Sequence, residues 1–130
     1  MILDTTVLID LMHGEHAAEE KIKSLIEQGI PLAVTTINIF ELFSGVAQCS
    51  KPALERERIN RVLSDQVRWQ LDEASAERGG LVHGELAKHG LEIDPEDAMI
   101  AGIALQRREP VLTRNVKDFS RVAGLKVESY

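Results

Sequence analysis

Three acidic residues that lie far apart in the sequence are the first candidates for chemistry: Asp4, Glu41 and Asp97. Each follows a short apolar run or lies in the helix expected directly behind one, so a parallel sheet would bring all three to one edge. Carboxylates within a few Å repel and raise one another's pKa, and a hard metal ion bound through oxygen relieves that repulsion. The three positions therefore predict a site for a divalent cation such as Mg²⁺.

A second group of candidates lies in the short segment that follows a late apolar run. Thr113, Asn115 and Asp118 offer oxygen atoms as ligands, while Arg114 and Lys117 offer positive charge to a phosphate group. The alternative is a plain turn in which Asp118 caps a short helix. A cation site beside phosphate-binding side chains predicts a magnesium-dependent enzyme that cleaves phosphodiester bonds.

Each of the three acids also has a purely structural explanation, which the sequence alone leaves open. Asp4 could cap the helix that begins near Thr6, and Glu41 could belong to a solvated stripe of its helix. Asp97 could simply be an acid in a first helical turn, where the helix dipole contributes about 0.3–1 kcal/mol. The small apolar residues that follow Asp97 favour function, because they let that helix pack closely on a sheet and place its first turn at the rim.

The elements that must position these side chains alternate between strand and helix. Apolar runs predict strands at residues 1–3, 32–35, 67–71, 111–113 and 125–128. Helical spacing predicts helices at 6–12, from about 18 to 29, and at 37–48, 51–63, 73–89 and 95–108, although Gly79 and Gly80 weaken the one that contains them. Parallel strands need crossover connections, so we expect a single domain, 1–130, with a three-layer α/β/α architecture and a five-stranded parallel sheet.

Composition and charge limit the classes of function. The chain has 44% apolar and 28% charged residues, as in globular proteins, and its single Cys49 excludes an internal disulfide. No secretory signal or membrane span is recognisable, so we expect no membrane contact and a cytoplasmic location. The net charge of −6 repels polyanions, so contact with nucleic acid would need a bound cation or local positive charge from residues such as Arg56, Arg58 and Arg61.

In four segments, taken in order, the chain resembles the PIN-domain ribonucleases, and in particular the VapC-type toxins. The segments are the opening Ile2–Asp10, the stretch Thr36–Gly45 with its Glu41-Leu42 pair, the helix start Asp97–Ala101, and the turn Thr113–Phe119. Each motif is loose, but together they run the length of the chain in the family's order.

The resemblance implies dependence on Mg²⁺ or Mn²⁺, cleavage of RNA, a homodimer, and inhibition by a cognate antitoxin. It also implies that Asp4 and Asp97 hold the metal, while Glu41 and Asp118 orient the attacking water or a second ion. Thr6, Thr113 or Asn115 would position the phosphate. The chain departs from the family at Asn115, a neutral residue where the family commonly has its fourth acid.

Two other functions remain open at this level. The first is a catalytically weak or inactive PIN-like module that binds RNA or protein, which Asn115 would explain. The second is a phosphoacceptor domain or small metal phosphatase, which needs an aspartate after a central strand and a later lysine. Asp72 and Lys117 are poor candidates for that pair.

Overall fold

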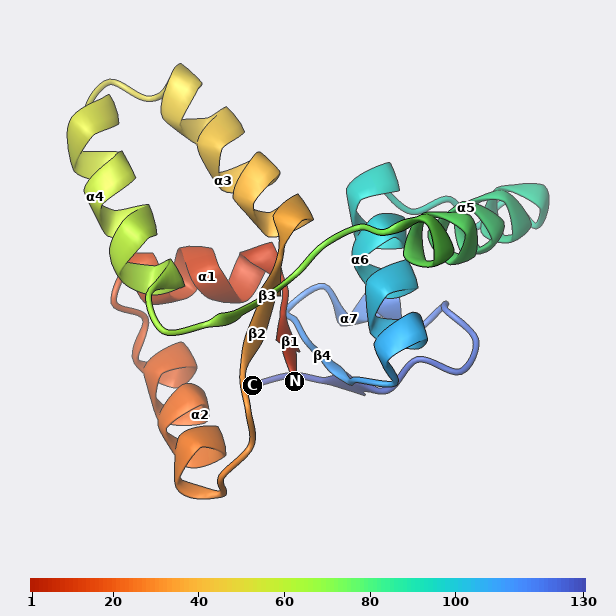
Figure 1. Cartoon of the computed structure of the whole chain (residues 1–130), viewed down its shortest axis with the longest axis horizontal. Helices are drawn as coiled ribbons and strands as arrows, with labels where there is room; N and C mark the ends of the chain where they lie inside the picture. Colours follow the sequence, from red (N-terminus) through yellow and green to blue (C-terminus); the bar gives the residue numbers. More distant parts are fainter.

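The computed structural model describes all 130 residues and contains one parallel sheet of five strands in the order β3-β2-β1-β4-β5 (Figure 1). The strands are short and lie within the predicted runs: β1 (Ile2–Leu3), β2 (Ala33–Thr35), β3 (Val67–Trp69), β4 (Val111–Leu112) and β5 (Val127–Glu128). The predicted fold class, a three-layer domain around a five-stranded parallel sheet, is confirmed.

Seven helices connect and cover the strands, six of them where the sequence predicted helices. They are α1 (Thr5–Met12), α2 (His16–Glu27), α3 (Thr36–Gln48), α4 (Pro52–Leu63), α5 (Glu73–Lys88), α6 (Pro95–Arg107) and α7 (Val116–Phe119). The short helix α7 occupies the segment for which a turn and cap had been the alternative. No helix combines the length and apolar character needed to cross a bilayer.

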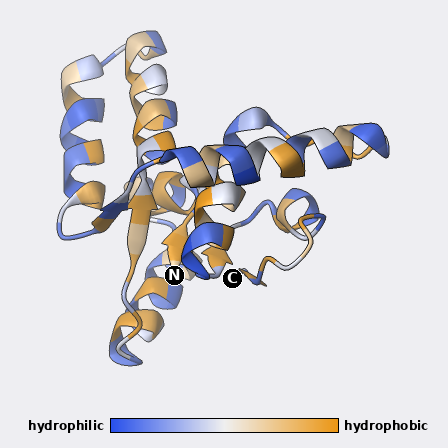
Figure 2. Ribbon diagram, turned by 45° about the vertical axis from the view of Figure 1, so that its right-hand side comes forward, coloured by the Kyte–Doolittle hydropathy of each residue, from blue (hydrophilic) through white to orange (hydrophobic).

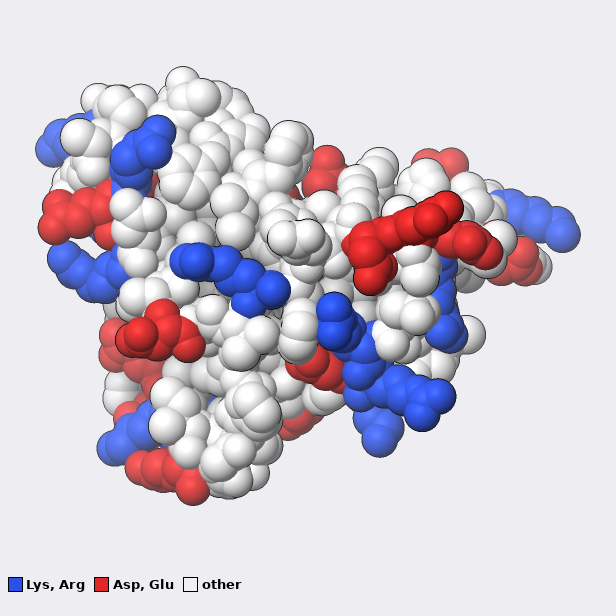
Figure 3. All heavy atoms as spheres, in the orientation of Figure 1, with Lys and Arg blue, Asp and Glu red and all other residues white.

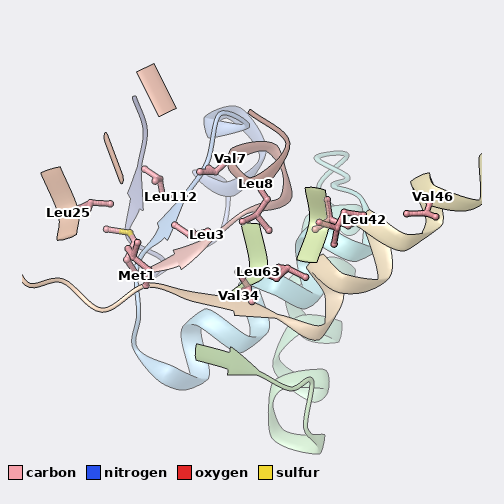
Figure 4. Packing of buried hydrophobic residues seen from close by; sticks show 12 residues of the cluster. Met1, Leu3, Val7, Leu8, Leu25, Val34, Leu42, Val46, Leu63 and Leu112 are labelled. Carbon is pink, nitrogen blue, oxygen red and sulfur yellow. The ribbon is translucent and has the colours of Figure 1, made fainter. Parts of the chain in front are cut away.

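The sheet separates two hydrophobic cores of similar size, because successive residues of a strand point to opposite faces. Three strands each contribute one residue to the core beside α1, α2, α3 and α4. The adjacent residue of each strand lies in the core beside α6 and α7. These alternating pairs are Leu3 and Ile2, Val34 and Ala33, and Leu112 and Val111. Figure 4 shows the first core, and Figure 2 shows the apolar strands at the centre of the molecule.

Two glycines allow α5 and α6 to cross at very short distance. A Cβ atom at Gly102 would lie 2.4 Å from the backbone oxygen of Ser75, and one at Gly79 would lie 2.8 Å from the backbone oxygen of Ala98. The sequence-based expectation that the glycine pair weakens α5 was therefore incomplete. Gly79 makes a close helix contact, whereas a Cβ at Gly80 would meet open space. The contact fixes α6, whose first turn carries Asp97.

The strand order creates one natural crevice for a ligand. From the central strand β1 the chain proceeds to β2 and β3 on one side, and then returns to β4 and β5 on the other. Ligands of such sheets bind beyond the carboxyl ends of the strands, where the order reverses. Here that point lies between β1 and β4. Asp4 directly follows β1, and Thr113 directly follows β4, so both residues lie at this point.

Candidate active site

Asp4 lies at the end of β1, and its carboxylate is held by two threonine hydroxyls. Its Oδ2 atom accepts a hydrogen bond of 2.7 Å from Thr113 Oγ1 and one of 2.8 Å from Thr6 Oγ1. Asp4 occupies the N-cap position of α1, but its side chain makes no capping bond, so the structural alternative does not explain it. The other oxygen, Oδ1, accepts no hydrogen bond within the chain. Because every buried polar side-chain atom has a partner, Oδ1 is accessible to solvent.

The two hydroxyls that hold Asp4 are themselves fixed by backbone groups. Thr113 Oγ1 accepts a bond of 2.8 Å from the amide of Asn115, and Thr6 Oγ1 accepts one of 3.2 Å from the amide of Arg114. Thr113 is completely buried and donates its hydroxyl proton to Asp4, so in this structure it orients that carboxylate. A contact between Thr113 and substrate stays a prediction.

Glu41 projects from α3 toward the start of α1. Its Oε1 accepts a 2.7 Å bond from Thr5 Oγ1, which accepts a 2.9 Å bond from the amide of Asn38. Asn38 in turn forms a capping box with Thr35 at the start of α3. Sequence reasoning missed this network, although the Thr-x-x-Asn spacing at a helix start was a usable signal. Burial, and then repulsion from Asp4 among other acids, raises the pKa of Glu41.

Asp97 lies in the first turn of α6, where its carboxylate meets the side chain of Asn115. The amide nitrogen of Asn115 donates bonds of 3.0 Å to Asp97 Oδ2 and 3.1 Å to Asp118 Oδ2. Partial burial, followed by repulsion from Asp4 and Glu41, raises the pKa of Asp97 to about 7. Asp4 and Glu41 therefore both contribute to the electrostatic environment of Asp97.

Asp118 differs from the other acids because both of its oxygens have partners. One accepts the bond from Asn115, and the other lies 3.6 Å from the guanidinium of Arg121. Asp4, Glu41 and Asp97 each use one oxygen within the protein and leave the second without a partner in the chain. Asp118 therefore lies beside Asp97, but its carboxylate is less available to bind a further group than those of Asp4, Glu41 and Asp97.

The predicted cationic residues are distributed unevenly around this edge. Arg114 binds Asp10 through its guanidinium, whereas the exposed Lys117 has no partner within the chain. On α4, Arg58 and Arg61 lie 3.7 and 3.5 Å from glutamates one turn away. Figure 3 shows positive side chains on α4 and near the C-terminal end of α6, with acidic ones along α5. No continuous positive surface covers this face.

The donor set at this edge fits a hard divalent cation in its chemistry. No group of three Asp, Glu, His or Cys side chains converges closely enough to hold an ion by itself. Mg²⁺, however, usually keeps several waters and takes only one or two carboxylates directly. The free oxygens of Asp4 and Asp97 fit that requirement, and a cation held by them would relieve the repulsion that, after burial, raises the pKa of Asp97.

Comparisons with known proteins agree with this geometry. The chain is similar to the tRNA(fMet)-specific endonuclease VapC of Shigella flexneri, with 30% identity over 129 residues, covering 99% of this chain and 96% of the relative. It is also 32% identical over 119 residues to ribonuclease VapC19 of Mycobacterium tuberculosis, covering 91% and 90% of the two chains.

Solved structures show the same fold. The structure is similar to a chain of VapBC2 from Rickettsia felis, solved with a promoter DNA fragment, at a TM-score of 0.90 and 22% identity, covering 99% of this chain and 97% of that one. For DNA-bound VapBC from Salmonella typhimurium, the TM-score is 0.87 at 26% identity, with 98% and 96% covered. The family model for the PIN domain matches residues 1–125. The chain therefore belongs to the PIN-domain family, among its VapC-type members.

Proposed function

We propose that this protein is a metal-dependent endoribonuclease that hydrolyses RNA phosphodiester bonds, and that it is the toxin of a toxin–antitoxin pair. The observation that carries the proposal is the set of three carboxylates at the switch point of the sheet. Each is oriented by a hydrogen bond from the protein, and each keeps one oxygen free. The relatives' names, endonuclease and ribonuclease, support the same activity.

Asp4 and Asp97 would hold the metal through their free oxygens. When bound, Mg²⁺ or Mn²⁺ supplies neutralisation of the phosphate charge and activation of water for in-line attack. The two threonine hydroxyls on Asp4 and the Asn115 amide on Asp97 keep these carboxylates in fixed orientations. Such supporting bonds matter because their loss typically lowers metal affinity or activity about 10- to 100-fold.

Glu41 is suited to orient the attacking water. Thr5 fixes one of its oxygens, and the other has no partner within the chain. The raised pKa of Glu41, caused first by burial, makes its carboxylate a better proton acceptor than an ordinary glutamate. The role assigned to Asp118 is weaker, because its contact with Arg121 competes with any contact to water.

The proposal includes a protein partner. Several similar solved structures carry the names of VapBC or other toxin–antitoxin complexes, which supports a cognate antitoxin for this chain. The homodimer remains a prediction from the resemblance, and the mass of the purified protein in solution tests it directly.

The decisive experiment measures cleavage of a labelled RNA by the wild-type protein with Mg²⁺, with Mn²⁺, and with a chelator. We expect cleavage that the chelator abolishes and that Asp97→Asn removes. Asp94→Asn is the matched control, because Asp94 is an exposed acid at the start of the same helix whose side chain makes no capping bond. Undiminished cleavage in the chelator, or equal losses in both variants, contradicts the proposal.

One observation favours a second candidate function, a PIN-like module that binds RNA with little or no turnover. Asn115 supplies a neutral amide between Asp97 and Asp118. Single-turnover reactions with enzyme in excess separate the two functions. Saturable RNA binding without products over many hours would favour the binding module, and products that appear in proportion to bound RNA would favour the nuclease.

A further inference from the structure

Beside the carboxylates lies a second, separate cluster of polar residues made by Asp10, Arg114 and Tyr130. The Nη1 atom of Arg114 donates to both oxygens of Asp10, at 2.9 and 2.8 Å, and the Tyr130 hydroxyl donates to Asp10 Oδ2. Only 7% of Asp10 is exposed, although it is an acid. These residues come from α1, from the turn after β4 and from the end of the chain, so only the folded structure brings them together.

The cluster leaves the outer part of the Arg114 guanidinium free. Both contacts with Asp10 use Nη1, so Nη2 and Nε have no partner within the chain. The Arg114 side chain is 57% exposed, whereas the Asp10 side chain is only 9% exposed. The arginine borders an open cavity of about 450 Å³, which is lined by Thr6, Ile9, Asp10, Arg114 and Asn115.

This cavity adjoins the candidate active site through short connections. The backbone amide of Arg114 bonds to Thr6, which holds Asp4, and the next residue, Asn115, bonds to Asp97. A guanidinium with two free nitrogens can bind phosphate through parallel hydrogen bonds, which a flexible lysine does not provide. A phosphate bound in the cavity would therefore lie beside the acids that hold the metal.

We propose that Asp10 and Tyr130 are positioning residues, which hold Arg114 as a fixed contact for the RNA phosphate next to the scissile one. This inference rests on the proposed nuclease function and deepens it. The buried carboxylate stays ionised: burial alone would raise the pKa of Asp10, but the hydrogen bonds from Tyr130 and Arg114 bring it below its ordinary value. Asp10 therefore anchors one side of the guanidinium, while the other side meets RNA.

The proposal makes a prediction opposite in sign to simple electrostatics. If Asp10 only contributed charge, then Asp10→Asn would remove a negative group and strengthen RNA binding. If Asp10 positions Arg114, the same substitution frees the arginine and weakens binding. We expect Asp10→Asn to raise KM several-fold with kcat within about twofold, since the contact acts on binding more than on chemistry.

The controls use the remaining members of the cluster and one neighbour. Arg114→Gln should raise KM about tenfold, as loss of a charge-assisted hydrogen bond does, and lower the salt slope of binding by about 0.7. Tyr130→Phe keeps the ring and should give a smaller rise than Asp10→Asn. Glu15→Gln removes an exposed acid that influences Arg114 only through its charge, so KM should stay the same or fall.

A double-mutant cycle distinguishes positioning from a merely structural role. If Asp10 acts through Arg114, the pair Asp10→Asn with Arg114→Gln should have the KM of Arg114→Gln alone. Additive losses, or tighter binding by Asp10→Asn, overturn the proposal. Should Asp10→Asn fail to fold, the cycle is repeated with Tyr130→Phe. If wild-type protein binds RNA without cleaving it, the nuclease proposal fails, and equilibrium binding by the same variants still tests the positioning of Arg114.

Discussion

Replacing Asp97 by asparagine should stabilise the metal-free protein at neutral pH while removing its response to Mg²⁺. Partial burial and repulsion from Asp4 and Glu41 raise the pKa of Asp97 from 3.8 to about 7. A pKa difference of this size corresponds to roughly 4 kcal/mol. Because Asp97 is partly exposed, water screens the repulsion, and we expect about 1–2 kcal/mol instead.

The sign of the pH dependence follows from proton binding. Between pH 4 and 7 the folded protein retains the Asp97 proton while the unfolded chain releases it, so the free energy of unfolding decreases as pH rises. Above pH 7 both states are ionised at this residue, and the loss is complete. Asp97→Asn removes the ionisable group, so the variant should match the wild type near pH 4 and exceed it by about 1–2 kcal/mol at pH 8.

Urea unfolding between pH 5 and 8, followed through the single tryptophan Trp69, measures this difference. In parallel, Mg²⁺ at 100 times its dissociation constant should add about 2.7 kcal/mol to the wild type and nothing to Asp97→Asn. Asp94→Asn serves as the control. Asp94 lies at the exposed start of α6 and also repels Asp97, but it is not one of the proposed metal ligands, so this variant should retain the metal response. An Asp97→Asn protein that is no more stable than wild type at pH 8, or whose advantage is the same at every pH, would refute the reasoning.

Three further predictions follow from individual contacts. Thr113→Val keeps the shape of a buried residue but removes a hydrogen bond to Asp4, so Mg²⁺ affinity, measured by titration, should fall about 10- to 100-fold. Gly102→Ala should lose roughly 1–3 kcal/mol in urea unfolding because its Cβ meets backbone atoms of α5, while Gly80→Ala, in open space, should gain up to about 1 kcal/mol. Asn115→Asp should lower the melting temperature without metal and raise the Mn²⁺ affinity, since it adds a carboxylate between those of Asp97 and Asp118. An unchanged affinity would argue that this position lies outside the metal site.

The fold could be predicted from the sequence because its signals are local. Short apolar runs, helical spacing and helix-start residues such as Asp94-Pro95 are each confined to a few neighbouring positions. The five strands and the six longer helices lie where these patterns indicated, with ends that differ by up to a few residues. The alternation of strand and helix then left a parallel sheet as the natural arrangement.

The candidate site was only partly accessible to such reasoning. The positions of Asp4, Glu41 and Asp97 behind apolar runs pointed to one edge of the sheet, and their mutual effect on pKa is consistent with that. Thr113 looked like a ligand because its residue type and place in the turn are those of one. Its complete burial and its hydrogen bond to Asp4 depend on how β4 packs against β1.

The sequence by itself determined which side chains could do chemistry and near which edge of the sheet they would lie. Only the tertiary structure decided which oxygen of each carboxylate is occupied, and that Asp10 and Tyr130, 120 positions apart, share a hydrogen bond. The physical reason is that the pattern of buried and exposed positions depends on neighbouring residues, whereas a hydrogen bond depends on strand register and helix packing to within a fraction of an ångström. Strand register and helix packing are set by contacts throughout the chain.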